Sequence, residues 1–131
     1  MALNILVVDD SLVVRKMIIK ALGLSDLPLG EVFEAASGFE GLAVLDKHWV
    51  DLVLADLNMP GMNGEEMIER IRANPALSDI PIVVVSTEGS KTRIDRLSEM
   101  GARFIHKPFP PEQIQSVVTG ILGLQHETNN V

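Results

Sequence analysis

The chain contains no cysteine, and only 4% of its residues are aromatic. Without cysteine there is no disulfide framework, no thiolate metal site and no thiolate nucleophile. Because aromatic residues are scarce, the core has to be built mainly from Ile, Leu, Val, Ala and Met. No apolar run approaches the roughly 20 residues of a membrane-spanning helix, and the N-terminus lacks the basic start and cleavage site of a signal peptide. These absences predict a cytoplasmic protein without a membrane segment.

Positively charged residues are also fewer than negatively charged ones. The chain has 11 Lys and Arg against 18 Asp and Glu, which gives a formal net charge of −7. That sign is wrong for a module that binds nucleic acid directly, because the phosphate backbone repels it. The length of 131 residues suits one domain, and 47% hydrophobic residues can fill one core. We expect a single domain over residues 1–124 and a polar, frayed tail over residues 125–131.

Five apolar runs alternate with five helix-like segments along the chain. The runs span Leu3–Val8, Val32–Ala36, Leu52–Ala55, Ile82–Val85 and Arg103–His106. The first, third and fourth runs are nearly continuous and β-branched, as in strands that are covered on both faces. The second and fifth runs are diluted by other residues and fit edge strands. The alternation predicts an α/β fold made of parallel β-α-β units with right-handed crossovers.

The helical segments carry apolar residues at the spacing of one helix face. Ser11 can cap the start of the first helix and Ser90 that of the fourth, because a serine hydroxyl accepts hydrogen bonds from free N–H groups. Gly23 and Gly101 are predicted to end these two helices. Trp49 is expected to pack at a helix end rather than to serve as a binding platform.

Groups suited to phosphoryl chemistry follow four of the five runs. They are Asp9 and Asp10, Asp56, Ser86 with Thr87, and Lys107. Parallel strands bring their carboxyl ends to one edge, where open α/β sheets bind ligands. Each group alone has an ordinary explanation as a helix cap, a turn residue or a solvated lysine. Chance alone does not readily place such groups at four strand ends, so the pattern predicts one shared site.

The acidic residues suit a magnesium ion. Asp9 and Asp10 repel each other, and a hard divalent cation relieves that repulsion while keeping several of its waters. We assign direct binding to Asp10 and a water-mediated contact to Asp9. Asp56 is a further ligand or a nucleophile that accepts a phosphoryl group as an acyl phosphate. The backbone carbonyl of Asn58 can bind the same ion, which would screen negative charge in the transition state.

The hydroxyl and the lysine complete the predicted site. Ser86 can donate a hydrogen bond to a phosphoryl oxygen. The proline after Lys107 restricts its backbone direction, which helps to aim the ammonium. That ammonium can pair with Asp56 at rest and with a phosphate oxygen afterwards.

With these residues the chain resembles a response-regulator receiver domain of two-component signalling, in particular the stand-alone chemotaxis type. The similarity spans Leu3 to Leu124 and is carried by Asp9-Asp10, Asp56 in D-L-N-M-P-G-M-N-G, Ser86 in V-V-V-S-T-E and Lys107 in K-P-F. The resemblance implies a flavodoxin-like, doubly wound sheet of five parallel strands in the order 2-1-3-4-5, with five helices.

The resemblance also implies a function. Asp56 would accept a phosphoryl group from a histidine of a sensor kinase or phosphotransfer protein, or from a small donor such as acetyl phosphate, with Mg²⁺ as cofactor. The Ser86 hydroxyl would swing toward the phosphoryl group and Phe104 would follow, changing the face of the fourth helix, fifth strand and fifth helix. Asn58 and Glu88 would tune the water that hydrolyses the phosphoaspartate, so we expect a short-lived signal. The expected output is contact with a downstream protein.

Two other functional classes fit less well. A haloacid-dehalogenase-type phosphatase places a second Asp two residues after its nucleophile, and here Asn58 stands there. A flavodoxin-like flavin carrier needs Ser, Thr and Gly after the first strand, where this chain has acid. We therefore expect no enzyme activity beyond the domain's own phosphorylation and dephosphorylation. Two possibilities stay open: the chain is a stand-alone regulator, or it is a receiver domain excised from a longer regulator.

A basic edge on the fourth helix has two interpretations. Lys91, Arg93 and Arg96 form this edge. Most such runs are solvated faces. Because this helix borders the output surface of the family that the chain resembles, contact with a partner is the alternative.

Overall fold

The computed structural model describes the backbone of residues 2–130 and the side chains of residues 2–121. In chain order its elements are β1 (Leu3–Val8), α1 (Leu12–Gly23), β2 (Leu29–Ala35), α2 (Gly38–Lys47), β3 (Leu52–Ala55), α3 (Gly64–Ala73), β4 (Ile82–Ser86), α4 (Lys91–Glu99), β5 (Arg103–His106) and α5 (Pro111–Asn130). Within this range the strands form one parallel sheet in the order β2-β1-β3-β4-β5. The predicted fold class is confirmed, and the two diluted runs are the edge strands.

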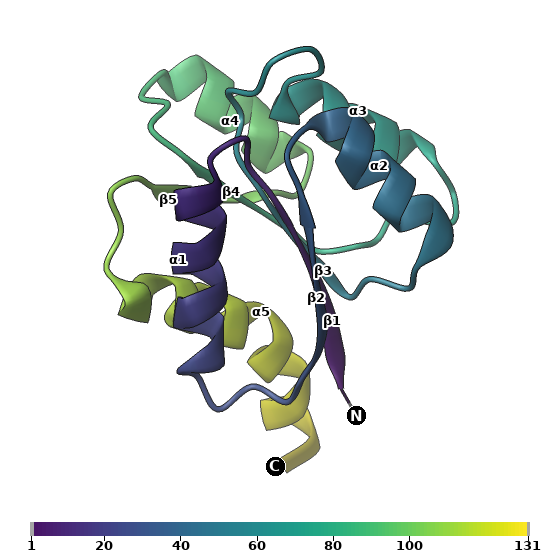
Figure 1. Ribbon diagram of the computed structural model, residues 1–131. Coiled ribbons are helices and arrows are strands. Elements are labelled where there is room, and N and C mark those ends of the chain that lie inside the picture. Colours follow the sequence, from purple (N-terminus) through teal and green to yellow (C-terminus); the bar gives the residue numbers. More distant parts are fainter. Residues whose placement is uncertain (1, 131) are drawn as a thin grey trace.

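The sheet lies between two layers of helices (Figure 1). Helices α1 and α5 cover one face, and α2, α3 and α4 cover the other. Along β1, Leu6 and Val8 pack under α2–α4, whereas Ile5 and Val7 pack under α1 and α5. Alternate side chains of a strand point to opposite faces, so a strand covered on both faces has to be apolar at every position. This explains the continuous apolar runs of the central strands.

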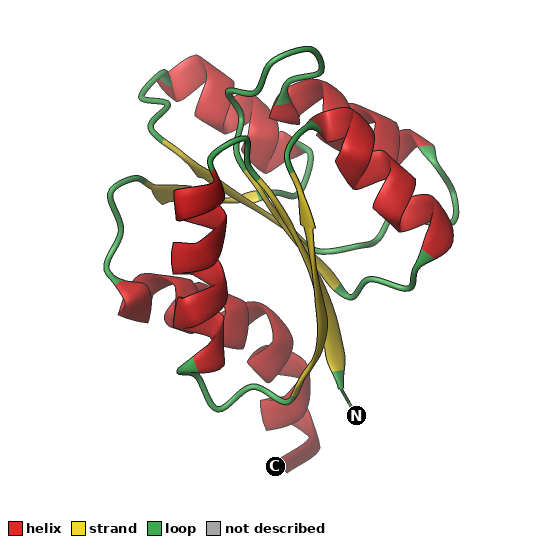
Figure 2. Cartoon of the chain, viewed as in Figure 1, coloured by secondary structure: helices red, strands yellow, loops and turns green. Residues whose placement is uncertain are grey.

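Four helices begin at polar caps directly after loops that leave the carboxyl ends of strands. The side chains of Ser11, Ser37, Asn63 and Ser90 each accept a hydrogen bond from a backbone N–H three residues further on. These bonds satisfy N–H groups that have no partner inside the helix. The caps of α1 and α4 are those expected from the sequence, and they fix where the loops end (Figure 2).

Two element boundaries differ from the predicted ones by three residues or more. Strand β2 begins at Leu29, three residues before the predicted Val32, because Leu29 pairs with Leu3 before an irregularity in the β1–β2 register. Helix α5 continues to Asn130, through most of the segment expected as a polar tail. The side chains of residues 122–131 lie outside the described part, and the domain boundary at residue 124 stays a prediction. Within the described residues, no helix combines the length and apolar character that crossing a membrane requires.

Candidate functional site

The carboxyl ends of the strands are aligned by backbone hydrogen bonds that continue past the strands. The Asp56 N–H donates to the Val8 carbonyl at 2.9 Å, and the Lys107 N–H donates to the Ser86 carbonyl at 2.9 Å. The Lys107–Pro108 peptide bond is cis. The residues that follow these strands therefore leave the sheet at the same edge, where the loops gather (Figure 2).

Three carboxylates meet at this edge. Asp9, Asp10 and Asp56 each offer an oxygen that lies within 4.8 Å of those of the other two. Asp9 and Asp56 are buried, with 1% and 6% of their surface exposed, whereas Asp10 is exposed to solvent. Buried charges need partners of opposite charge or hydrogen-bond donors, because leaving water is costly for an ion. Oxygen ligands at this spacing suit a small divalent cation, so the cluster could hold a metal.

Lys107 lies between the two buried carboxylates. Its Nζ donates to Asp9 Oδ2 at 2.8 Å and lies 3.4 Å from Asp56 Oδ2. The other oxygen of Asp9 accepts the Ser11 N–H at 2.9 Å, and that of Asp56 accepts the Leu57 N–H at 2.8 Å. Among the described contacts, the Lys107 ammonium thus pairs with two of the three clustered carboxylates. The cluster keeps a net negative charge that attracts a cation.

The predicted switch residues lie on neighbouring strands. Ser86 is completely buried at the end of β4, and its Oγ accepts a hydrogen bond from the Glu88 N–H at 3.2 Å. Thr87, the next residue, is exposed. Phe104 on β5 is partly buried against the core, with its ring edge-on to His106 at a centroid distance of 4.7 Å. The buried hydroxyl at this edge of the sheet therefore belongs to Ser86.

The loop between β3 and α3 folds tightly back onto the backbone of Asp56. The Gly64 N–H donates to the Leu57 carbonyl at 2.9 Å, and a β-carbon at position 64 would lie 2.1 Å from the Asp56 carbonyl oxygen. Gly61 in the same loop has a φ of 78°, which also favours glycine. Asn58 is exposed in this loop. Sequence reasoning missed the role of Gly64, although its place at the end of G-M-N-G directly before a helix was a signal.

Ion pairs connect α3 with α4 beside the site. Arg93 Nε lies 3.1 Å from Glu65 Oε2, Arg93 Nη1 pairs with Glu88, and Arg96 Nη1 pairs with Glu65. Burial raises the pKa of Glu65, but the hydrogen bonds from Arg96 and Arg93 lower it by more, so it lies below its ordinary value. Two of the three cations on the predicted basic edge of α4 are thus engaged within the chain, whereas Lys91 is exposed.

Arg15 anchors the start of α1 to the site. Its Nη1 donates to the Asp9 carbonyl at 2.6 Å, and its Nε pairs with Glu34 of β2 at 3.0 Å. Lys16 also pairs with Glu34, and its hydrogen bond is the main cause that holds the pKa of Glu34 below the ordinary value. No pattern in the sequence indicates these contacts, because the partners belong to different elements.

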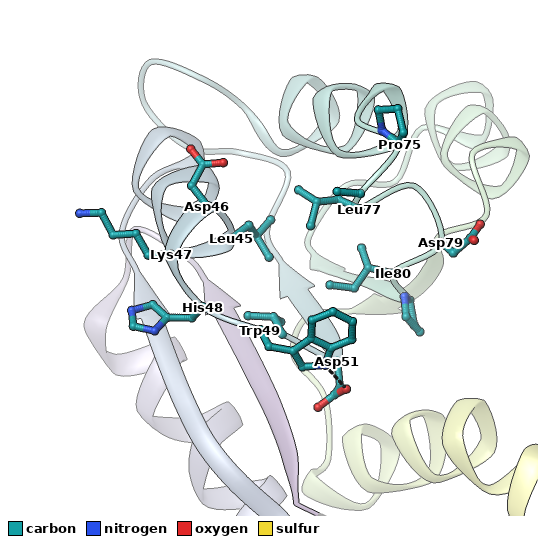
Figure 3. A pocket seen from close by; sticks show the side chains of 13 residues that line it. Leu45, Asp46, Lys47, His48, Trp49, Asp51, Pro75, Leu77, Asp79 and Ile80 are labelled. Carbon is teal, nitrogen blue, oxygen red and sulfur yellow. Dashed lines mark hydrogen bonds between the residues drawn. The ribbon is translucent and has the colours of Figure 1, made fainter.

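A groove of about 640 Å³ lies elsewhere on the molecule, between the end of α2 and the segment before β4. Figure 3 shows the indole of Trp49 beside Asp51, with Leu45, Leu77 and Ile80 also lining the groove. Trp49 is 77% exposed, so the expectation that it packs at the helix end is wrong. Its N–H donates to Asp51 at 2.9 Å, which holds the ring at the rim of the groove. The groove borders the starts of β3 and β4, at the edge opposite the acidic cluster.

Comparison with known proteins gives consistent matches. Residues 5–119 match the family described as the response regulator receiver domain. A chemotaxis protein CheY homolog of Campylobacter jejuni is 36% identical over 123 residues, which cover 92% of this chain and 93% of the relative. The structure of chemotaxis response regulator CheY4 of Vibrio cholerae matches with a TM-score of 0.82 at 32% identity, covering 92% of this chain and 99% of that one. The phosphorylated cyanobacterial phytochrome response regulator RcpA matches with a TM-score of 0.78 at 30% identity, covering 92% and 91%.

Proposed function

The chain belongs to the response regulator receiver domain family, and we propose that it is a cytoplasmic phosphoacceptor switch that is phosphorylated on Asp56. The donor would be a phosphohistidine of a sensor kinase or phosphotransfer protein, or a small phosphodonor. The observation that carries the proposal is the convergence of three carboxylates and Lys107 at the carboxyl ends of the strands. The structure of a phosphorylated relative at 30% identity supports it.

Asp56 is positioned to act as the nucleophile. In the reaction a carboxylate oxygen of Asp56 forms a bond to phosphorus, while the bond from phosphorus to the donor breaks and the donor atom keeps the electron pair. The Leu57 N–H holds one oxygen at 2.8 Å, which fixes the orientation of the carboxylate. Lys107, 3.4 Å from the other oxygen, can pair with the negatively charged phosphoryl oxygens as transfer proceeds.

The donor set fits Mg²⁺. Asp10, Asp56 and the backbone carbonyl of Asn58 would bind the ion directly. Asp9 would act through water, while the Ser11 N–H and Lys107 hold its carboxylate in place. When bound, Mg²⁺ would offset the negative charge of the carboxylates and of the incoming phosphoryl group.

Ser86 and Phe104 would convert the new charge into a change of shape. At rest the Ser86 oxygen accepts the Glu88 N–H, so its own proton can be donated to a phosphoryl oxygen. Phe104, on the neighbouring strand and only partly buried, would follow the movement of the hydroxyl. The population would shift toward a second arrangement of the face formed by α4, β5 and α5. A downstream protein would bind that face.

Two residues in the loops beside the predicted phosphoryl position would set the lifetime of the phosphoaspartate. Asn58 lies in the loop after Asp56, and Glu88 lies in the loop after Ser86. Their polar side chains would influence how water reaches and attacks the phosphoaspartate. We propose that the phosphorylated state is short-lived.

Intact mass measurement tests the proposal. The protein is incubated with acetyl phosphate, with or without Mg²⁺, and compared with Asp56→Asn. We expect the mass of one phosphoryl group to be added in the wild type with Mg²⁺, and no addition in the variant or after chelation of the metal. Equal labelling of the variant would contradict the assignment of Asp56. Turnover of an added phosphoester would favour a phosphatase instead.

A further inference from the structure

Arg93 of α4 holds two carboxylates from different segments, Glu65 in the first turn of α3 and Glu88 in the loop between β4 and α4. Its Nε pairs with Glu65 Oε2 at 3.1 Å, and its Nη1 pairs with Glu88 Oε1. The three side chains are 26%, 11% and 19% exposed for Arg93, Glu65 and Glu88, so all three are largely shielded from solvent. A planar guanidinium holds two carboxylates in directions set by its rigid array of N–H donors, whereas the donors of a lysine rotate.

Glu88 connects this arginine to the switch hydroxyl. Its backbone N–H donates to Ser86 Oγ at 3.2 Å, and its Oε2 accepts the N–H of Ser90, the cap of α4, at 3.1 Å. Both oxygens of the Glu88 carboxylate are therefore occupied, one by Arg93 and one by a backbone donor. In this arrangement the carboxylate is not free to orient a water molecule.

Glu65 connects the same arginine to the phosphoacceptor loop. It follows Gly64, which packs directly on the backbone of Asp56 and donates its N–H to Leu57. A chain of contacts thus runs from the loop after β3, through Glu65 and Arg93, to the loop after β4. Desolvation lowers the pKa of Arg93, but the hydrogen bonds that it donates to Glu65 and Glu88 raise this pKa by more, so the arginine stays charged.

We propose that Arg93 is a positioning residue that holds the Glu88 carboxylate in an ion pair and thereby slows the loss of the phosphoryl group from Asp56. Without Arg93, the Glu88 carboxylate is released beside the switch hydroxyl, where it can accept a hydrogen bond from an attacking water. The hydrolysis itself stays the same: a water oxygen bonds to phosphorus, the bond from phosphorus to the Asp56 oxygen breaks, and the water's proton is released. This inference rests on the proposed function for its effect on rate.

The first test measures the loss of phosphoryl from Asp56 after removal of acetyl phosphate in the presence of Mg²⁺. For Arg93→Gln we expect loss about 5-fold faster than in the wild type, the scale of one partly exposed ion pair. In a Glu88→Gln background, adding Arg93→Gln should change the rate by less than about 2-fold, because the group through which Arg93 acts is already neutral. An unchanged lifetime in Arg93→Gln, or an equal acceleration in both backgrounds, would overturn the inference.

Arg96→Gln is the matched control. It removes the same charge from the same helix and breaks a pair with the same Glu65, but Arg96 has no described contact with Glu88. Its phosphoryl lifetime should stay within about 2-fold of the wild type, because the Glu88 carboxylate keeps its pair with Arg93. Acceleration as large as that of Arg93→Gln would assign the effect to charge in general and contradict the inference.

The second test needs no phosphorylation. Hydrogen exchange of the Glu88 N–H, measured by NMR in the unphosphorylated protein, should be about 5-fold faster in Arg93→Gln and unchanged in Arg96→Gln. If the wild type accepts no phosphoryl group, the proposed function fails and the rate effect fails with it. In that case the exchange data still show whether Arg93 holds the Glu88 loop. An unchanged exchange rate of the Glu88 N–H in Arg93→Gln would show that it does not.

Discussion

The ammonium of Lys107 lies 2.8 Å from the Asp9 carboxylate, although the two residues are 98 positions apart in the sequence. Lys107 follows the edge strand β5, whereas Asp9 follows β1 on the other side of β3 and β4. The lysine thus reaches across the strand ends and passes Asp56 at 3.4 Å. One side chain therefore neutralises part of the charge that the fold concentrates at this edge.

Replacing Lys107 with Met should destabilise the fold when no metal is present. Asp9 and Asp56 would then be buried charges without their cation, which we expect to lower the free energy of unfolding by about 2 kcal/mol. Added Mg²⁺ should recover more stability in this variant than in the wild type. Urea denaturation followed by circular dichroism measures both effects, with the exposed Lys91→Met as control. A variant as stable as the wild type in chelator would argue against the pairing.

Gly64→Ala should disturb the site through the backbone. The added β-carbon would lie 2.1 Å from the Asp56 carbonyl oxygen, so the loop has to move, at a cost of about 1–3 kcal/mol. Phosphorylation by acetyl phosphate should fall as well. Gly120→Ala is the matched control, because no atom lies within 4 Å of its added carbon and alanine favours a helix. Equal stability of the two variants would show that the close contact is unimportant.

Glu65 should contribute stability that depends on pH. Burial raises its pKa and the hydrogen bonds from Arg96 and Arg93 lower it by more, so in the folded protein it lies below 4.5. Such a group stabilises the fold above its unfolded pKa, and the contribution is lost as the pH falls through the folded value.

We therefore expect Glu65→Gln to cost about 1–2 kcal/mol at neutral pH. The difference from the wild type should shrink below pH 4.5. Denaturant titrations across this range measure the difference, and the exposed neighbour Glu66→Gln serves as control. Stability curves that stay parallel into acid would contradict the assignment.

Ser86→Ala should separate phosphorylation from the change of shape. The nucleophile is intact, so the variant should still accept a phosphoryl group on Asp56. The chemical shift change of Phe104 on phosphorylation should be lost, because no buried hydroxyl is left to move. Thr87→Ala removes the adjacent, exposed hydroxyl and should keep the response. A full Phe104 response in Ser86→Ala would assign the switch to another group.

The sequence predicted the central strands well because burial on both faces leaves a continuous apolar signal. The edge strand β2 was predicted to begin too late, since Gly30 and Glu31 at its exposed start have poor strand propensity. The candidate site residues could be named because parallel strands must deliver their last residues to one edge. The partner predicted for Lys107 was Asp56, which lies 3.4 Å from its ammonium. The shorter hydrogen bond to Asp9, which crosses the ends of two intervening strands, was not predicted.

Contacts between helices could not be predicted in the same way. Glu65 has the features of an acid that suits the start of a helix, and Arg93 those of a solvated base. Their pairing depends on the packing of α3 beside α4, which leaves no periodic signal in the sequence. The exposed position of Trp49 was not predicted either, and its N–H donates to the nearby Asp51.

The central claim is that Asp56 carries the phosphoryl group, and reductive trapping tests it most directly. An acyl phosphate is reduced by borohydride, which converts the modified aspartate to homoserine, whereas a free carboxylate does not react. After treatment with acetyl phosphate and Mg²⁺, peptide mass spectrometry should find homoserine at position 56 and aspartate at positions 9 and 10. Homoserine at position 9 or 10, or at no position in a protein that has gained phosphoryl mass, would contradict the account.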